Sequence, residues 1–260
     1  MSANSEQKPD PDELPFVAPC KQLNTLAPLN WLKLGWQDIK SAPKQSLTYG
    51  AVMLIISYFI SIVSYLIGDI YLLVAMLSGF ILMGPVLAIG LYSISCQLQH
   101  NLTPHLGYCL REGHRHIGNQ IIFAAILLVV FLVWARAAAM LHVFFPVEVK
   151  PKPEDLLMFL GIGSAVGAVF ATIIFSAAAF SLPMIMDKKV DTVTAIITSV
   201  NAVLRNKKAM FIWASIIVLC VVIGFLTALL GLLVLLPLIG HATWHAYQET
   251  IDASIWPEHD

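Results

Sequence analysis

The chain has 260 residues, of which 58% are hydrophobic and only 12% are charged, and its formal net charge is -1. A soluble domain of this size cannot bury so much apolar surface, because too few polar side chains remain to face water. Lipid must therefore surround much of the chain, and the small net charge excludes the basic surface that nucleic-acid binding requires. The apolar runs are too long for the alternating strands of a barrel, so we predict an all-α, polytopic membrane helical bundle.

The chain divides into three predicted regions. Residues 1–28 are polar and are expected to form a disordered N-terminal tail, residues 29–252 the membrane domain, and residues 253–260 a C-terminal tail. No basic start followed by a short apolar core is present, so we expect the first membrane helix to direct insertion. The four cysteines are scattered without a C-x-x-C pair, which indicates reduced thiols rather than a disulfide framework.

Long apolar runs predict the membrane-spanning helices, each of which needs about 20 residues. The last run, residues 209–247, is unbroken, and one helix over it would be about 57 Å long, nearly twice the hydrocarbon thickness. We therefore predict two helices there with Gly231 at the turn, and a total of five spans is the alternative. The six predicted spans are Leu47–Ile67, Tyr71–Ile94, Ile121–Phe145, Leu157–Leu182, Ala209–Leu229 and Leu232–Gln248.

Basic residues predict the orientation, because lysine and arginine are enriched in cytoplasmic loops. They precede the first span and lie in the connections after the second and fourth spans, whereas the other connections carry Asp69 or the mixed run PVEVKPKPED. We expect a multi-pass protein of the bacterial inner membrane with both termini in the cytoplasm. The basic residues are Lys33, Lys40, Lys44, Arg111, Arg115, Lys188, Lys189, Arg205, Lys207 and Lys208.

Three similar passages, LMGPVLAIG, FSLPMIMD and LVLLPLIGH, indicate an internal repeat. Each places a proline (Pro85, Pro183 or Pro237) late in the second helix of a hairpin, where it would kink the helix by removing a backbone hydrogen bond. A polar, amphipathic segment precedes each hairpin, and we expect these segments to form cytoplasmic helices in the membrane interface. The chain is therefore predicted to contain three copies of one unit, an amphipathic helix followed by a membrane hairpin.

Four passages, LGWQDI, GPVLAIGLYSIS, LREGHRHIGNQI and GHATWHAY, carry a resemblance to a known family. The sequence resembles a bacterial family of predicted six-helix integral membrane proteins known only as a domain of unknown function. Some members are labelled cytochrome c oxidase subunit I-like. More distantly, residues 181–213 are similar to the membrane repeats attached to glycerophosphodiester phosphodiesterases, whose catalytic domain has no counterpart in this sequence. The resemblance implies the fold and no particular reaction.

His241 and His245 stand four residues apart, so on a helix both imidazoles would share a face and could bind one metal ion. The third ligand would come from elsewhere, and the six-span topology places His114 and His116 on the same side of the membrane. A structural role at the membrane–water interface is the alternative, since Trp244 is typical of that region. The pair cannot supply both axial ligands of a haem, because these approach from opposite faces. We predict no cofactor other than this metal ion.

Arg136 is the one basic residue inside a predicted span. A charge in hydrocarbon is costly and is typical of a substrate or proton path. A buried contact between helices is a second interpretation, and a side chain that extends to the outer interface is a third. In the fourth span, small residues between Gly161 and Ala171 predict close packing of helices.

Three classes of function are compatible with these features. We favour a non-enzymatic structural or accessory component of a membrane complex, whose partners are the lipid bilayer and other subunits. A transporter or lipid-handling protein is the second class, based on the repeat and on Arg136. A metal-binding or redox accessory protein related to oxidases is the third, based on His241 and His245. No nucleotide-binding loop, nucleophile elbow or zinc-protease motif occurs in the sequence.

Overall fold

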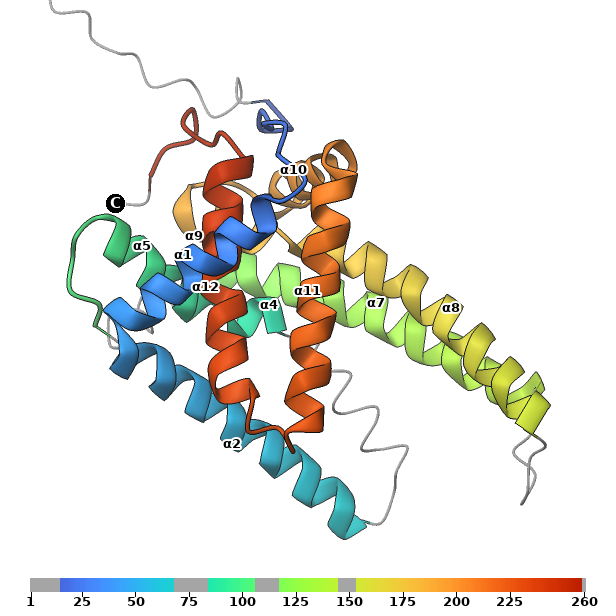
Figure 1. The fold of residues 1–260 in the computed structure, drawn as a ribbon. Helices are drawn as coiled ribbons and strands as arrows, with labels where there is room; N and C mark the ends of the chain where they lie inside the picture. The colour runs from blue at the N-terminus through green and yellow to red at the C-terminus, as the bar shows by residue number, and fades with distance from the viewer. Residues whose placement is uncertain (1–14, 68–83, 106–116, 145–152, 259–260) are drawn as a thin grey trace, which may run out of the picture.

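The computed structural model describes residues 15–67, 84–105, 117–144 and 153–258. Within these ranges the regular structure is helical, with two isolated β-bridges, as the all-α prediction requires. The helices, drawn in Figure 1, are α1 (Ala27–Ser41), α2 (Pro43–Ile67), α4 (Gly84–Leu87), α5 (Ile89–Gln99), α7 (Ile117–Phe144), α8 (Pro153–Ala178), α9 (Ser181–Asp187), α10 (Thr192–Arg205), α11 (Lys207–Leu226) and α12 (Leu232–Thr250).

Three helical segments of the described chain are long and apolar enough to cross a membrane: Pro43–Ile67, Gly161–Asp187 and Lys207–Leu226. They overlap the first, fourth and fifth predicted spans. Most of the second predicted span lies outside the described residues, and α7 occupies the third. Helix α12 occupies the sixth, but its second half carries the polar sequence HATWHAYQET and it is not one of the three apolar segments.

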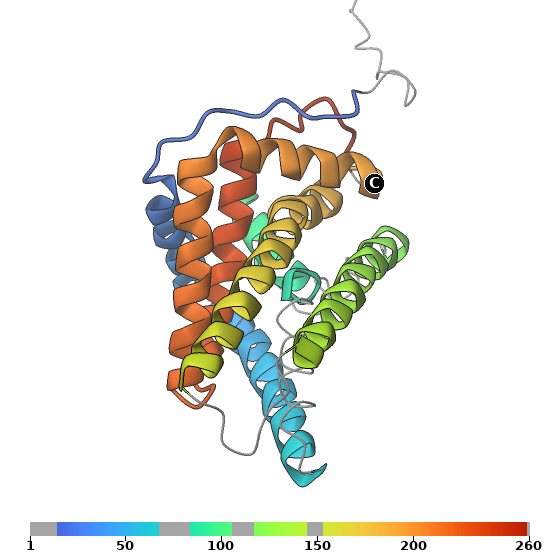
Figure 2. The same ribbon diagram turned by 90° about the vertical axis from the view of Figure 1, so that its right-hand side faces the viewer.

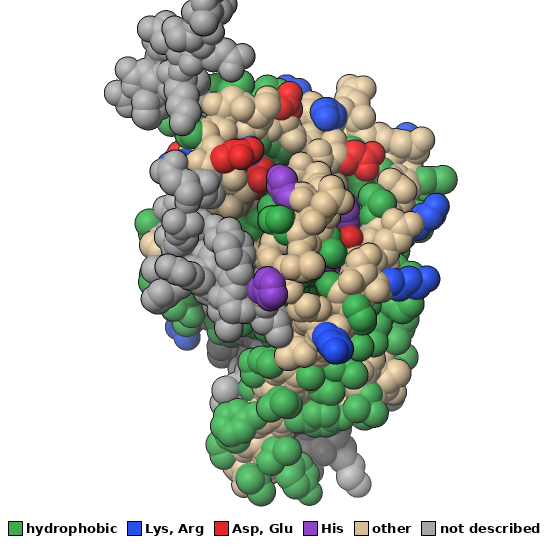
Figure 3. Space-filling view, turned by 90° about the vertical axis from the view of Figure 1, so that its left-hand side faces the viewer, with side chains coloured by type: hydrophobic (Ala, Val, Ile, Leu, Met, Phe, Trp, Pro, Cys, Tyr) green, Lys and Arg blue, Asp and Glu red, His purple; other side chains and the backbone are tan. Residues whose placement is uncertain are grey.

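Apolar side chains are exposed along the membrane helices. On α2 they recur at helical spacing and form one stripe, as expected for a surface that faces lipid. In Figure 3 hydrophobic atoms cover the lower part of the molecule, whereas lysine, arginine, acidic and histidine side chains gather above them. The stripe consists of Val52, Ile55, Phe59, Ile62 and Leu66.

Helix α12 lies at the centre of the packed end of the molecule, where it contacts α1, α2, α5, α9 and α11. Glycines allow the closest approaches. A Cβ atom on Gly35 of α1 would lie 2.8 Å from the backbone nitrogen of Ala242, and one on Gly50 of α2 would collide with the carbonyl oxygen of Leu233. The backbones of α1 and α2 therefore pack directly against that of α12.

The three prolines occupy different positions in their helices. Pro85 lies in the short helix α4, Pro183 lies in the first turn of α9, and Pro237 lies inside α12. Ahead of Pro183 the helix is interrupted at residues 179–180, which separate α8 from α9. The segments that follow the prolines, which are α5, α9 and the second half of α12, are largely buried and contact one another.

The turn between α11 and α12 differs from the prediction in one respect. It lies at residues 227–231, as expected, but the left-handed residues are Ala228 (φ 50°) and Leu229 (φ 70°). Gly231 lies in the turn, as predicted, but has a helical φ of -59°, so it does not supply the left-handed conformation. Glycine is required there for space instead, because a Cβ would lie 2.6 Å from Oγ1 of Thr227.

The described parts of both predicted tails pack against the helices. The backbone N–H of Lys21 donates to the carbonyl of Thr250 (2.9 Å), and that of Asp252 donates to the carbonyl of Pro19 (2.9 Å). In the C-terminal segment Trp256 is buried. In Figure 2 the N-terminal segment passes over α10 beside the C-terminal segment. Residues 15–28 and 253–258 therefore pack against the membrane domain.

Helix α10 directs its apolar side outwards. Thr194, Thr198 and Ser199 face the neighbouring helices and are buried, whereas Val193 and Ile197 are exposed. This polarity is opposite to that of a helix on a soluble core. It suits the predicted position of the amphipathic segment in the membrane interface, where the apolar face contacts lipid.

Candidate functional site

His241 lies inside a chain of hydrogen bonds at the centre of the packed end. Its side chain is 0% exposed. Its Nε2 atom is 2.9 Å from Oγ of Ser46 in α2, and its Nδ1 atom is 2.7 Å from Oγ of Ser95 in α5. The Ser95 hydroxyl in turn donates to Oδ2 of Asp38 in α1 at 2.6 Å. The chain therefore joins α12 to three other helices.

The hydrogen-bond network assigns the protons of this chain. Because the Ser95 hydroxyl donates to the carboxylate of Asp38, its oxygen accepts from the Nδ1–H of His241. A neutral imidazole fits this arrangement, with its Nε2 accepting the hydroxyl proton of Ser46. A neutral imidazole is also the form that a fully buried site favours, since an isolated buried charge is costly.

Asp38 connects the buried chain to a second histidine that is closer to solvent. Its Oδ2 atom is 2.8 Å from Nε2 of His245, one turn further along α12, and 3.9 Å from Nδ1 of His241. The side chains of His245 and Asp38 are 19% and 13% exposed. We call Asp38, Ser46, Ser95, His241 and His245 the polar node.

Three further hydrogen bonds from large aromatic side chains surround the polar node. Trp244 and Tyr247 are buried among neighbouring helices, so they do not lie in an open belt at the membrane–water interface. Trp31 also stands edge-on to Trp213 of α11, with ring centroids 5.6 Å apart. The bonds run from Trp31 Nε1 to Glu249 Oε2 (2.6 Å), from Trp244 Nε1 to Gln99 Oε1 (3.1 Å) and from Tyr247 OH to Asp187 Oδ2 (2.7 Å).

The predicted metal ligands are brought together only in part. His241 and His245 share one side of α12, as their spacing predicts, but both ring nitrogens of His241 contact serine hydroxyls. In the parts of the chain that the structure describes, no group of three or more His, Cys, Asp or Glu residues could hold a metal ion. His114 and His116 lie outside those parts, so metal binding stays a prediction.

Arg136 lies on the exposed side of α7. It lines a shallow groove on that helix with five neutral residues, and α7 packs against α8 and α10. This position favours the interpretation in which the side chain extends to the membrane surface. The other residues of the groove are Val129, Leu132, Val133, Ala137 and Met140.

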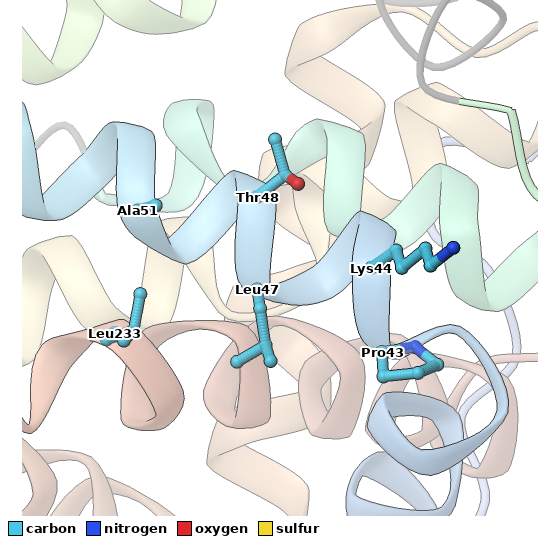
Figure 4. Close-up of a pocket in the computed structure, with 6 residues that line it drawn as sticks. All are labelled: Pro43, Lys44, Leu47, Thr48, Ala51 and Leu233. Carbon is cyan, nitrogen blue, oxygen red and sulfur yellow. The ribbon is translucent and has the colours of Figure 1, made fainter.

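A second shallow groove lies between α2 and α12 (Figure 4). Leu47 of α2 reaches towards α12, and Leu233 of α12 points back towards α2. Lys44 is at one end of the groove, whereas Leu233 lies beside Gly50 and Ala51, about two turns further along α2. The remaining lining residues are Pro43 and Thr48.

Sequence reasoning identified the histidines and missed their partners. Ser46, Ser95 and Asp38 are far from the histidines in the chain and match no motif. The one available signal was Asp38, an acidic residue close to the buried side of a helix predicted to be amphipathic.

The fold and its apolar surface define an α-helical integral membrane protein. Residues 72–187 match the model of the family described as "Predicted integral membrane protein (DUF2189)". Over these residues the match agrees with the family that the sequence resembles, and the family description states no reaction. No curated protein and no solved structure matches the chain.

Proposed function

We propose that the protein is a non-enzymatic component of the bacterial inner membrane that presents a rigid cytoplasmic platform to another subunit of a membrane complex. The platform comprises α1, α5, α9, α10 and the second half of α12. The observation that carries the proposal is the bonding of the polar node. The groups best suited to proton transfer or metal binding are engaged in bonds that join four helices, so their main effect is to fix the relative positions of those helices.

The proposed topology has three helical hairpins that enter and leave the membrane on the cytoplasmic side. Three hydrogen bonds support it. Two groups that bond to each other lie on the same side of the membrane, so the chain between them crosses the membrane an even number of times. This parity argues against five spans. The bonds are Lys21 N to Thr250 O (2.9 Å), Gln45 Nε2 to Pro104 O (2.8 Å) and Lys188 Nζ to Glu258 Oε1 (2.9 Å).

The proposed repeat has independent support from the packing. The segments that follow Pro85, Pro183 and Pro237 meet one another in the platform, where they are largely buried. Equivalent parts of three copies of one unit are expected to occupy equivalent places. The amphipathic helices α1 and α10 each precede one hairpin, as the repeat requires.

Purification from native membranes in a mild detergent tests the proposed role. We expect a partner subunit to co-migrate with the protein at a fixed stoichiometry, identified by mass spectrometry. Asp38→Ala, which opens the polar node, should weaken the association. Glu154→Gln at the exposed start of α8 is the matched control and should leave it unchanged. Migration of the wild-type protein alone, as a monomer, would refute the proposal.

A further inference from the structure

The turn between α11 and α12 exposes apolar side chains among the residues that the structure describes. We call Leu226–Gly231 the hairpin tip. The sequence from residue 209 to residue 240 contains no charged residue. At the tip, the side chains of Leu226 and Leu230 are 81% and 59% exposed. The other two predicted outer connections contain charged residues, so the tip differs from them in chemistry.

The backbone N–H groups of the tip need no water. Each N–H group from Thr227 to Leu235 donates to an acceptor within the hairpin, including that of Gly231, which donates to Oγ1 of Thr227 at 2.9 Å. The hydroxyl of Tyr58 in α2 donates to the carbonyl of Ala228 at 2.5 Å. Irregular backbone is tolerated at membrane depth only where other groups replace the hydrogen bonds of water. The N–H groups of the tip meet that condition.

The position of α1 limits how deep the tip can reach. Lys33 and Lys40 are exposed on α1, so this helix lies at or near the membrane surface. It crosses α12 at Gly35, close to the carbonyl of Leu238. Only one and a half turns of α12 remain below Leu238, which correspond to about 9 Å of helix. The hydrocarbon layer is about 30 Å thick, so this arm of α12 is too short to cross it by itself.

Helix α2 gives a second measure of the depth. Tyr58, which contacts the tip, lies about 21 Å along α2 from Lys44 near its start. At the far end, α2 contacts the tip through Tyr58 and then continues to Ile67, a further length of about 13 Å. Figures 1 and 2 both show α2 extending beyond the tip. The tip therefore ends well before α2 does.

We propose that α11 and α12 form a re-entrant hairpin, which enters the membrane from the platform side and returns without reaching the far surface. Its tip contacts lipid acyl chains inside the hydrocarbon layer. The proposal replaces the last two predicted spans with one shallow pair and keeps both termini on the same side. It is independent of the proposed partner subunit.

Spin labelling of the full chain tests the depth of the tip. The four cysteines are replaced by serine, and single cysteines are introduced at Leu230, Phe59 or Tyr65 for labelling in vesicles of phosphatidylethanolamine and phosphatidylglycerol. Phe59 lies on α2 beside the level of the tip, and Tyr65 lies near the far end of α2; both are exposed. A label in hydrocarbon is highly accessible to molecular oxygen. A label in water is highly accessible to a water-soluble nickel chelate.

We expect the label at Leu230 to match that at Phe59, with high oxygen and low nickel accessibility, and the label at Tyr65 to show several-fold higher nickel accessibility. A nickel accessibility at Leu230 closer to that at Tyr65 would overturn the proposal. The same variants in spheroplasts provide a second measurement without reconstitution. A membrane-impermeant maleimide should label Tyr65→Cys and leave Leu230→Cys unlabelled, and equal labelling of both would also overturn it.

Discussion

The substitution Ser46→Ala isolates one bond of the polar node. Ser46 is fully buried, and its hydroxyl donates to Nε2 of His241 at 2.9 Å. Every buried side-chain nitrogen or oxygen in the described residues has a hydrogen-bond partner. The variant would leave Nε2 of His241 without one. An unsatisfied buried acceptor costs about 1–3 kcal/mol. Removing one oxygen atom creates little cavity, so most of the change reports the lost bond.

Ser215→Ala is the matched control for this measurement. Ser215 is exposed on α11, and its hydroxyl bonds to the carbonyl of Phe211 in the same helix. Both substitutions exchange serine for alanine in a helix and gain the same small helix propensity, which cancels in the comparison. The free energy of unfolding is measured by titration with a denaturing detergent in mixed micelles, followed by tryptophan fluorescence.

We expect Ser46→Ala to be less stable than Ser215→Ala by about 1–3 kcal/mol. Combining Ser46→Ala with His241→Ala should then be non-additive, because the two residues share one bond. Equal stability of the two single variants would refute the role assigned to this bond. Additivity of the double variant would show that Ser46 acts through some other contact.

Three further predictions concern other parts of the fold. Gly35→Val should displace α1 from α12, because its Cβ would lie 2.8 Å from the backbone nitrogen of Ala242. Limited proteolysis should then cleave within residues 15–42. Resistance of this segment to cleavage would count against direct backbone packing. Tyr58→Phe removes the donor to the carbonyl of Ala228, so it should cost about 1 kcal/mol in the same unfolding titration, and no change would mean that this bond does not hold the tip. Partial burial raises the pKa of Asp191, but hydrogen bonds from the first turn of α10 outweigh it and lower the pKa. The cap therefore stabilises the fold above the unfolded pKa of about 3.9 and is lost as the pH falls through the folded value, so Asp191→Ala should cost about 1 kcal/mol at pH 7 and less in acid. A cost that does not vary with pH would contradict the ionised cap.

Local pattern was sufficient to predict several helices of this fold. The apolar runs in α2 and α11 and the amphipathic pattern in α1 and α10 are properties of neighbouring residues, and the structure contains helices at these positions. The spacing of His241 and His245 placed them on one side of α12 for the same reason. Polar composition predicted disorder at the chain ends, whereas residues 15–28 bond to Thr198 of α10, to Asn206 and to the end of α12.

The sequence by itself determined that the chain is helical and lies in lipid, because both follow from composition and from periodicity over a few turns. Only the tertiary structure decided what the histidines contact, since Ser46 and Ser95 are 195 and 146 residues from His241 along the chain. The depth of α12 was also undetermined, because an apolar run reads the same whether it crosses the membrane twice or turns back inside it. The proposed depth rests on the crossing of α1 at Gly35 and on the contact of Tyr58 with the tip, and both are contacts between residues distant in the sequence.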